Sequence, residues 1–366
     1  MKVLMIGLSN LGPYHFARFR ALTDLLPGFT YVQCPGKELY RPWSSDQGPP
    51  PCRIICLENG ASIKMFFEKE MPDVIMFMGY KAWTIIYAAL AAKKRGVPTI
   101  LHSDSTSNDH QRRRWKESAK KLVIGRLFDG AFVAGTRSAS YATSLGIPEN
   151  LIWKGVDVVD NSHFLTVNKS WQPPDNFPST YFITVARLSP EKNISRLLSA
   201  FESYRLKGGR WGLVVAGTGP AEHVLKKSVP ENISAFIRWH GWARYNELPS
   251  LYQGASCFIL PSISEPWGLV VNEAMASGLP VLVSSNCGCV PELCHAGVNG
   301  YSFDPYDVEQ LSELMLLMSS GRTDLCRMGE TSRQLIREYT PEKWAETIFD
   351  MTGSLLKNRI AAKAGR

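Results

Sequence analysis

Short runs of β-branched and aliphatic residues alternate along the chain with segments of helical periodicity. This alternation is typical of βαβ units, whose strands form a parallel sheet. In the first half the pattern predicts strands at residues 2–7, 53–57, 74–78, 99–102, 130–134 and 154–157. In the second half it predicts strands at residues 181–185, 212–216, 256–260 and 281–284. We therefore expect an α/β protein with two halves of similar size.

A polar segment at residues 161–179 separates the halves, because it contains two adjacent prolines and lacks periodicity. We expect two Rossmann-like, doubly wound domains that face a cleft and bind ligands at the carboxyl ends of their strands. The last helix is predicted to begin at Thr340-Pro341, with threonine as its cap and proline at its first position. The expected divisions are a first domain at 1–165, a linker at 166–179, a second domain at 180–345, and a terminal helix with a basic tail at 346–366 that crosses back to the first domain.

Neither an export signal nor a membrane span is predicted. The apolar run at residues 1–7 is short and passes directly into Ser9-Asn10-Leu11-Gly12, without a cleavage pattern. Residues 74–92 are long enough to suggest a span, but Gly79-Tyr80-Lys81 divides them into a strand and a helix at 82–95. We expect a cytoplasmic protein and leave open a peripheral place on the cytoplasmic face of the membrane.

Composition narrows the class of protein but does not identify its binding partner. The 366 residues are 45% hydrophobic and 20% charged, which excludes a disordered chain. The formal charge of +8 fits nucleic acid, an anionic membrane or phosphorylated substrates equally well. Eight cysteines suggest reduced thiols in a cytosol. Cys287-x-Cys289 with Cys294 matches no usual zinc spacing, so we interpret these cysteines as small residues in a tight loop.

The most informative segment runs from Ser264 to Val281. Gly268 opens a helix there, so the backbone N–H groups of Gly268, Leu269 and Val270 and the positive end of the helix dipole could bind an anion. Glu265 precedes the helix and Glu273 lies within it. Taken singly, these two residues could also be a helix cap and a solvated surface carboxylate.

This segment resembles the Glu-x₇-Glu signature of family 4 retaining glycosyltransferases, which have the two-domain glycosyltransferase B fold. The resemblance extends to further motifs along almost the whole chain: Lys154-Gly155-Val156-Asp157 with Phe164, Val185-Ala186-Arg187-Leu188-Ser189-Pro190-Glu191-Lys192-Asn193, Ala216-Gly217-Thr218-Gly219-Pro220, Pro261-Ser262 and Asn299-Gly300.

The resemblance implies roles in the second half for a nucleotide-sugar donor site. Arg187 and Lys192 would hold the departing diphosphate, because fixed cations stabilise the charge that develops on it. The alternative for Arg187 is a surface salt bridge. Glu265 would contact the donor sugar and Glu273 the ribose. The donor-binding set is completed by Gly217 and Gly219 in the glycine turn, by Gly268, Leu269 and Val270, and by Trp242 in the base region at residues 238–244.

The first half contributes two further candidates. Gly12 follows the first strand, where the family often has paired glycines, and would let the backbone approach the diphosphate. His102 ends a strand and matches a histidine that the family places near the transferred sugar; the alternative is a packed structural residue. Asp104 and Asp109 lie nearby and could touch the acceptor.

Two further features of the sequence concern a metal ion and a membrane surface. The sequence contains no Asp-x-Asp pair to hold a divalent cation, so we expect no metal and no other cofactor, with Arg187, Lys192 and the helix at Gly268 acting on the diphosphate. The basic run Arg112-Arg113-Arg114 beside Trp115 indicates an anionic membrane surface or a lipid-diphosphate acceptor. The alternative is a domain helix packed through its tryptophan stripe. No nucleic-acid reading motif is present.

These features predict a metal-independent retaining glycosyltransferase that moves a sugar from a nucleotide diphosphate, with UDP favoured, to a hydroxyl acceptor in glycan, glycolipid or polysaccharide synthesis. Two alternatives remain open. One is a sugar-nucleotide 2-epimerase of the same fold, and the other is a nucleotide-sugar binding subunit without catalysis.

Overall fold

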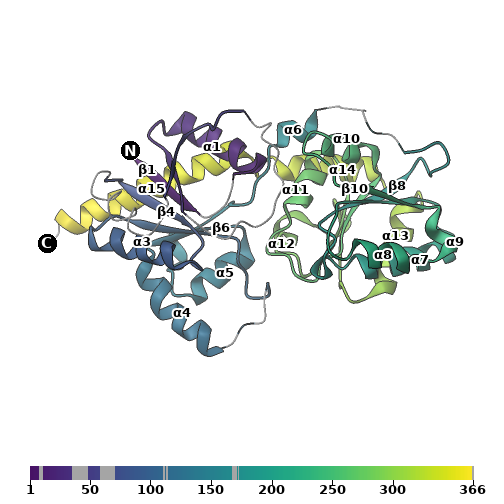
Figure 1. Cartoon of the computed structure of the whole chain (residues 1–366), viewed down its shortest axis with the longest axis horizontal. Coiled ribbons are helices and arrows are strands. Elements are labelled where there is room, and N and C mark those ends of the chain that lie inside the picture. Colours follow the sequence, from purple (N-terminus) through teal and green to yellow (C-terminus); the bar gives the residue numbers. More distant parts are fainter. Residues whose placement is uncertain are drawn as a thin grey trace. The chain divides into compact units, whose positions relative to one another are not determined.

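The computed structural model describes residues 1–7, 11–34, 48–57, 71–109, 112, 114–166, 171 and 173–364. The chain forms two compact units (Figure 1). The first unit comprises Met1–Ser107, Gln111–Asp160 and Tyr339–Arg366. The second unit comprises Asn108–His110 and Asn161–Glu338. The main segment of the second unit thus begins at Asn161, and the chain returns to the first unit at Tyr339.

The first unit contains a seven-stranded parallel sheet in the order β3-β2-β1-β4-β5-β6-β7. The chain leaves β1 for β2 on one side and continues with β4 on the other, which is the doubly wound arrangement. The strands are β1 (Val3–Gly7), β2 (Thr30–Gln33), β3 (Arg53–Cys56), β4 (Val74–Met78), β5 (Thr99–Ser103), β6 (Gly130–Val133) and β7 (Ile152–Lys154).

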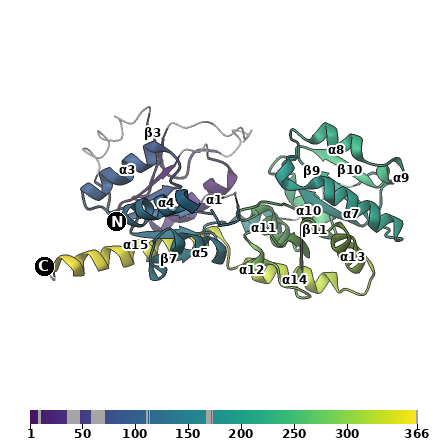
Figure 2. The ribbon, with the colours of Figure 1, turned by 90° about the horizontal axis from the view of Figure 1, so that it is seen from below.

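Helices cover both faces of this sheet, so its central strands are buried throughout. Alternate residues of β1 and β4 contact either α3 (Trp83–Lys94), α4 (Arg114–Leu127) and α5 (Thr136–Ser144), or α1 (Pro13–Leu25) and α15 (Pro341–Ala364). The terminal helix α15 therefore belongs to the core of the first unit, where it packs along α1 (Figure 2). Trp344, on the first turns of α15, is buried against Phe19 and Phe132.

The second unit contains a six-stranded parallel sheet in the order β10-β9-β8-β11-β12-β13. Its strands are β8 (Tyr181–Val185), β9 (Gly212–Ala216), β10 (Ile237–Gly241), β11 (Cys257–Leu260), β12 (Val281–Ser284) and β13 (Gly300–Phe303). Its helices are α6 (Asn161–Leu165), α7 (Ile194–Leu206), α8 (Glu222–Ser228), α9 (Glu231–Ser234), α10 (Leu248–Gly254), α11 (Leu269–Ala276), α12 (Val290–Leu293), α13 (Val308–Ser319) and α14 (Leu325–Ile336).

The predicted α/β class and the parallel sheets are confirmed, and most predicted strands lie within a residue of the observed bounds. Four differences remain. The strand predicted at 154–157 lies earlier, as β7, and the strands β2, β10 and β13 were not predicted. Two of the missed strands, β10 and β13, are sheet edges, and β10 carries Arg238 and His240 in place of a continuous apolar run.

Candidate active site

The point where the second sheet reverses its winding lies between β8 and β11, which are neighbours in the sheet. Parallel α/β sheets bind ligands outside the carboxyl ends of the strands at such a point. The loop after β8 carries Arg187 and Lys192, and the loop after β11 carries Ser262 and Glu265. The structure thus brings together, at the carboxyl edge of one sheet, the two predicted cations Arg187 and Lys192, which we call the clamp, and the predicted carboxylate Glu265.

Lys192 and Glu265 are in direct contact. The Lys192 ammonium donates to Glu265 Oε2 in a short ion pair, and both side chains are mostly shielded from solvent. The Ser262 hydroxyl also donates to Oε2, over 3.3 Å. Both of these contacts reach the same carboxylate oxygen, so the pair fixes the orientation of Glu265. The interpretation of Glu265 as a helix cap is wrong, because Gly268 is the N-cap of α11 and no side chain caps it.

The loop after β8 that carries Arg187 and Lys192, which we call the clamp loop, is ordered by its own polar residues. Arg187 is exposed at the end of β8. The Ser189 hydroxyl donates to Glu191 Oε1 at 2.6 Å. Burial by itself raises the pKa of the Glu191 carboxyl, but the bond from Ser189 and the charges of Lys192 and Arg187 outweigh it and hold that pKa below its ordinary value. The loop therefore gathers a stable carboxylate beside two cations.

Asn193 fixes this loop to two others, a role that we did not predict. Its backbone has φ +58°, a left-handed conformation that asparagine adopts more readily than most residues. Its buried side-chain amide donates to the carbonyl oxygens of Pro261, at 3.0 Å, and Pro305, at 2.7 Å. The segments after β8, β11 and β13 are thereby joined through one side chain.

The glycine turn after β9 packs backbone to backbone against the clamp loop. A Cβ on Gly217, which has φ +131°, would lie 1.9 Å from the carbonyl oxygen of Ala186. A Cβ on Gly219 would lie 2.4 Å from the carbonyl oxygen of Leu188. The Ala186 and Leu188 N–H groups donate to carbonyl oxygens of the turn. The two glycines therefore set the position of Arg187; their contact with a donor stays a prediction.

The segment around Glu265 rests on the loop after β12. Gly288 N–H donates to the Glu265 carbonyl oxygen at 2.9 Å, and a Cβ on Gly288 would lie 1.7 Å from the carbonyl oxygen of Pro266. Cys287 and Cys289 are buried free thiols in this loop. This agrees with the interpretation of both as small residues in a tight loop. Burial raises the pKa of the Cys289 thiol. Within the described residues, no three His, Cys, Asp or Glu side chains are grouped so as to hold a metal ion.

Helix α11 begins next to this ion pair. Gly268 has φ +109°, which favours glycine, and its Cβ would lie 3.0 Å from Leu260 and 3.4 Å from Glu265. The N–H groups at the start of a helix have no partner in a preceding turn, so those of Leu269 and Val270 lie where an anion would find donors. The Trp267 indole donates to Asn272 at 3.0 Å, which fixes the chain as it enters the helix.

Glu273 is not a solvated surface residue, so that alternative is wrong. Its side chain is fully buried, and Oε2 accepts a hydrogen bond from the Tyr252 hydroxyl at 2.7 Å. Tyr252 lies on α10, which packs against α11. The sequence does not identify Tyr252 as a site residue, because an isolated tyrosine in an apolar helix gives no signal of this role.

Trp242 lies at the other end of the same edge of the sheet. It follows β10 directly, and its side chain is 48% exposed. The carbonyl oxygen of Gly241 accepts a hydrogen bond from Gly217 N–H at 2.6 Å, so the tryptophan is anchored beside the glycine turn. An exposed aromatic ring in this position provides a flat surface for a nucleobase.

In the first unit, Gly12 and His102 lie at the carboxyl side of the sheet. Gly12 is the N-cap of α1, and its N–H donates to His15 Nδ1 at 3.2 Å. His102 is buried with its ring against Phe132 and Trp344. Burial and the nearby charge of Arg18 lower the pKa of His102 to about 3, so this imidazole is neutral at physiological pH. Ser9 and Asn10 lie outside the described residues.

The basic run before α4 has a different environment from the one predicted. Arg112 is largely buried: it donates to the carbonyl oxygens of Thr106 and Ser107 and to the Tyr141 hydroxyl, and its guanidinium lies 4.0 Å from the centre of the Tyr141 ring. Arg112 thus holds the loop after β5, and its side chain is mostly shielded from solvent. Arg113 lies outside the described residues, as does the side chain of Arg114.

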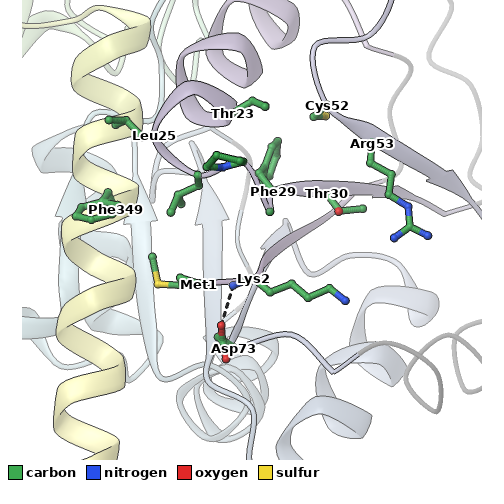
Figure 3. Close-up of a pocket in the computed structure, with 13 residues that line it drawn as sticks. Met1, Lys2, Thr23, Leu25, Phe29, Thr30, Cys52, Arg53, Asp73 and Phe349 are labelled. Carbon is green, nitrogen blue, oxygen red and sulfur yellow. Dashed lines mark hydrogen bonds between the residues drawn. The ribbon is translucent and has the colours of Figure 1, made fainter.

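A hollow of about 740 Å³ opens in the first unit, at the edge of the sheet where the strands begin (Figure 3). Lys2, Arg53 and Asp73 line it, together with Phe349 from α15. The Lys2 N–H donates to Asp73 at 2.7 Å. This edge lies opposite the carboxyl ends of the strands, so within the first unit the hollow is separate from Gly12 and His102.

Comparison with known proteins shows what this geometry is similar to. Residues 168–335 match the family described as glycosyl transferases group 1. This match spans most of the second unit. The O-antigen chain mannosyltransferase B of Escherichia coli is 34% identical over 158 residues, which are 42% of this chain and 40% of that protein. The chain thus spans less than half the length of the curated relatives that it matches first.

Solved structures match over nearly the whole chain. Anabaena HepE in complex with UDP has a TM-score of 0.75 at 14% identity, covering 97% of this chain and all of that one. A glycosyltransferase from Rickettsia africae has a TM-score of 0.76 at 14% identity, covering 98% of this chain and 99% of that one. The expected glycosyltransferase B fold is confirmed by these likenesses. No helix in the described residues is both long and apolar enough to cross a membrane.

Proposed function

We propose that the chain is a retaining glycosyltransferase that transfers a sugar from a nucleotide diphosphate donor, UDP in preference, to a hydroxyl acceptor. The observation that carries this proposal is the Lys192–Glu265 ion pair beside Arg187, at the switch point of a sheet that matches a glycosyltransferase family. The preference for UDP is supported by a structural neighbour, Anabaena HepE, whose complexes hold UDP and UDP-glucose.

The leaving diphosphate is the first group that the site must stabilise. When the bond between the anomeric carbon and the diphosphate breaks, negative charge grows on the diphosphate and positive character grows on the sugar. Arg187 is exposed where the phosphates would lie, and its planar guanidinium suits bidentate contact with phosphate oxygens. The N–H groups at the start of α11 supply further donors. These groups would stabilise the negative charge of the leaving diphosphate, as a bound metal cation would, so we propose that transfer needs no metal.

Glu265 is placed to act on the sugar. Its Oε2 accepts bonds from Lys192 and Ser262, and these bonds leave Oε1 to accept a hydrogen bond from a sugar hydroxyl. Lys192 would contact the diphosphate while it pairs with the Glu265 carboxylate, so it would link the diphosphate end of the donor to the sugar end. Gly12 and His102 of the first unit stay predicted donor residues, with His102 as a neutral hydrogen-bonding group.

Glu273, Trp242, Gly217 and Gly219 form the nucleoside side of the proposed site. Trp242 would stack on the base, and Glu273 would reach the ribose hydroxyls once Tyr252 and the ribose share its carboxylate. The acceptor is a hydroxyl compound, for which a lipid-linked glycan would suit a peripheral place on a membrane.

The proposal is tested with Arg187→Ala, Lys192→Ala and Glu265→Gln, each assayed for release of UDP from UDP-glucose. We expect each variant to lower kcat about 10²- to 10³-fold, equivalent to about 2.7–4 kcal/mol of transition-state stabilisation, with smaller effects on donor binding. Lys207→Ala is the matched control, because it removes another ion pair of the second unit, with Glu309, at the far end of α7.

Two outcomes would contradict the proposal. Turnover at the wild-type rate in both cation variants would exclude the clamp. A wild-type protein that UDP stabilises against heat, but that releases no nucleoside diphosphate from any UDP, GDP or ADP sugar, would be a binding subunit. The same thermal comparison of UDP, GDP and ADP identifies the base.

A further inference from the structure

Two neighbouring helices of the first unit, α3 and α4, carry an exposed aromatic and aliphatic face. On α3, Ile85, Ala88, Ala89 and Ala92 point into the core, so the opposite side of the helix faces outward. That side presents Trp83, Tyr87 and Leu90, four and three residues apart, and Trp83 is 84% exposed. A tryptophan this exposed buries almost none of its apolar surface in the unit that carries it.

Helix α4 continues this face. It packs into the same core through Ile124 and Leu127. Trp115 and Leu122 are 66% and 60% exposed, and Val123 is exposed beside them. The interpretation of α4 as a helix packed by its tryptophan stripe is therefore wrong. Helices α3 and α4 cover the same face of the sheet and lie next to each other (Figure 1). Their exposed sides are therefore neighbouring parts of the surface of the first unit.

The charges on these helices have one sign. The two helices contain seven lysine and arginine residues and a single acidic one, Glu117. Glu117 is neutralised within the unit by Lys120, at 2.7 Å, and by Arg112. Lys94, Lys116 and Lys121 remain exposed around the apolar residues. Aromatic residues surrounded by lysines suit the interface of a bilayer with anionic headgroups.

We propose that the outer face of α3 and α4, formed by Trp83, Tyr87, Leu90, Trp115 and Leu122 within a rim of lysines, docks on an anionic lipid bilayer. The tryptophan and tyrosine rings lie at the level of the headgroups, and the lysines contact anionic lipid. A second copy of the chain is a poorer occupant, because a symmetric dimer would bring two lysine rims together. The proposal replaces Arg112 as the membrane contact and is independent of the donor chemistry.

The test is cosedimentation of the full chain with vesicles of phosphatidylcholine, with or without phosphatidylglycerol. The wild type should bind only the anionic vesicles, and less at high salt. Lys94→Ser, Lys116→Ser and Lys121→Ser combined should weaken binding about 100-fold, since each cation near the surface contributes about fivefold. Trp83→Ser with Trp115→Ser should abolish binding while UDP release stays unchanged. All five side chains are exposed, so neither variant removes a core contact.

The matched control is Leu206→Ser with Val224→Ser, two equally exposed apolar residues of the second unit, which should leave vesicle binding unchanged. Two results would overturn the proposal. One is that the wild type fails to sediment with anionic vesicles, or that the variant without the two tryptophans sediments with them as well as the wild type does. The other is a wild-type dimer that Trp83→Ser with Trp115→Ser converts to a monomer, which would assign the face to self-association.

Discussion

The Tyr252 hydroxyl donates a hydrogen bond over 2.7 Å to Glu273, whose side chain is fully buried in the second unit. A buried carboxylate is stable only where polar partners replace the water it has lost. Tyr252 is such a partner, and it comes from a different helix, so the contact joins α10 to α11. Tyr252 is therefore a positioning residue for the proposed ribose contact.

Tyr252→Phe should reduce the free energy of unfolding by about 1.5–3 kcal/mol, the usual range for a hydrogen bond to a charged group. Weaker UDP binding should accompany it. Tyr181→Phe is the matched control, because the Tyr181 hydroxyl is buried without a hydrogen-bond partner in the described residues. Urea denaturation and UDP titration of both variants make the comparison. Equal stability of the two would mean that Tyr252 does not support Glu273.

Gly217→Ala should disrupt the clamp loop. Its Cβ would lie 1.9 Å from the backbone oxygen of Ala186, next to Arg187, and a backbone atom cannot rotate away as a flexible side chain can. Gly241→Ala is the control, since Gly241 also has a positive φ, of +78°, but open space around its Cβ position. We expect Gly241→Ala to lower the free energy of unfolding by about 1–2 kcal/mol, which is the cost of a left-handed non-glycine residue. We expect Gly217→Ala to lower it by more. Urea denaturation measures both losses, and similar values would show that the contact with Ala186 is unimportant.

Most of the strands that could be predicted are buried on both faces, although the edge strand β3, whose ends are exposed, was predicted as well. The bounds of β4 and β8 match the prediction because each is a continuous apolar run. The edge strand β10 could not be recognised in this way, because an edge strand tolerates Arg238 and His240. Strand β2 was missed because only four residues form it and the last is Gln33.

The identity of the site residues could be predicted, but not their contacts. Lys192 and Glu265 are far apart in sequence, and they meet only because β8 and β11 are neighbours, which periodicity does not specify. The burial of Glu273 depends on the packing of α10. Asn193 gave a signal that could have been used, because asparagine at the start of a helix is a residue type that tolerates positive φ.

Removal of divalent metal should leave the activity intact. The sequence has no Asp-x-Asp pair, and the groups proposed to hold the diphosphate are Arg187, Lys192 and the start of α11. UDP release from UDP-glucose should therefore persist in excess EDTA at the untreated rate. Loss of activity that manganese or magnesium restores would contradict this account of the phosphate site.

The last prediction concerns His102 and pH. Burial, aided by Arg18, lowers the pKa of His102 to about 3, whereas a histidine in the unfolded chain titrates near 6.5. Between these values the unfolded state binds a proton that the folded state does not, so stability falls as the pH falls below 6.5.

At pH 5 the shifted pKa of His102 lowers the free energy of unfolding by about 2 kcal/mol relative to its value at neutral pH. His102→Gln lacks the titrating ring, so the stability it loses between pH 7 and pH 5 should be smaller than the wild-type loss by about that amount. Urea denaturation at pH 7, 6 and 5 measures both slopes, and comparing the two proteins cancels the contribution of the other six histidines. Identical slopes would mean that His102 binds its proton equally well in the folded and unfolded states. In that case burial would not lower the pKa of His102, and its role as a group that stays neutral throughout this pH range would have to be abandoned.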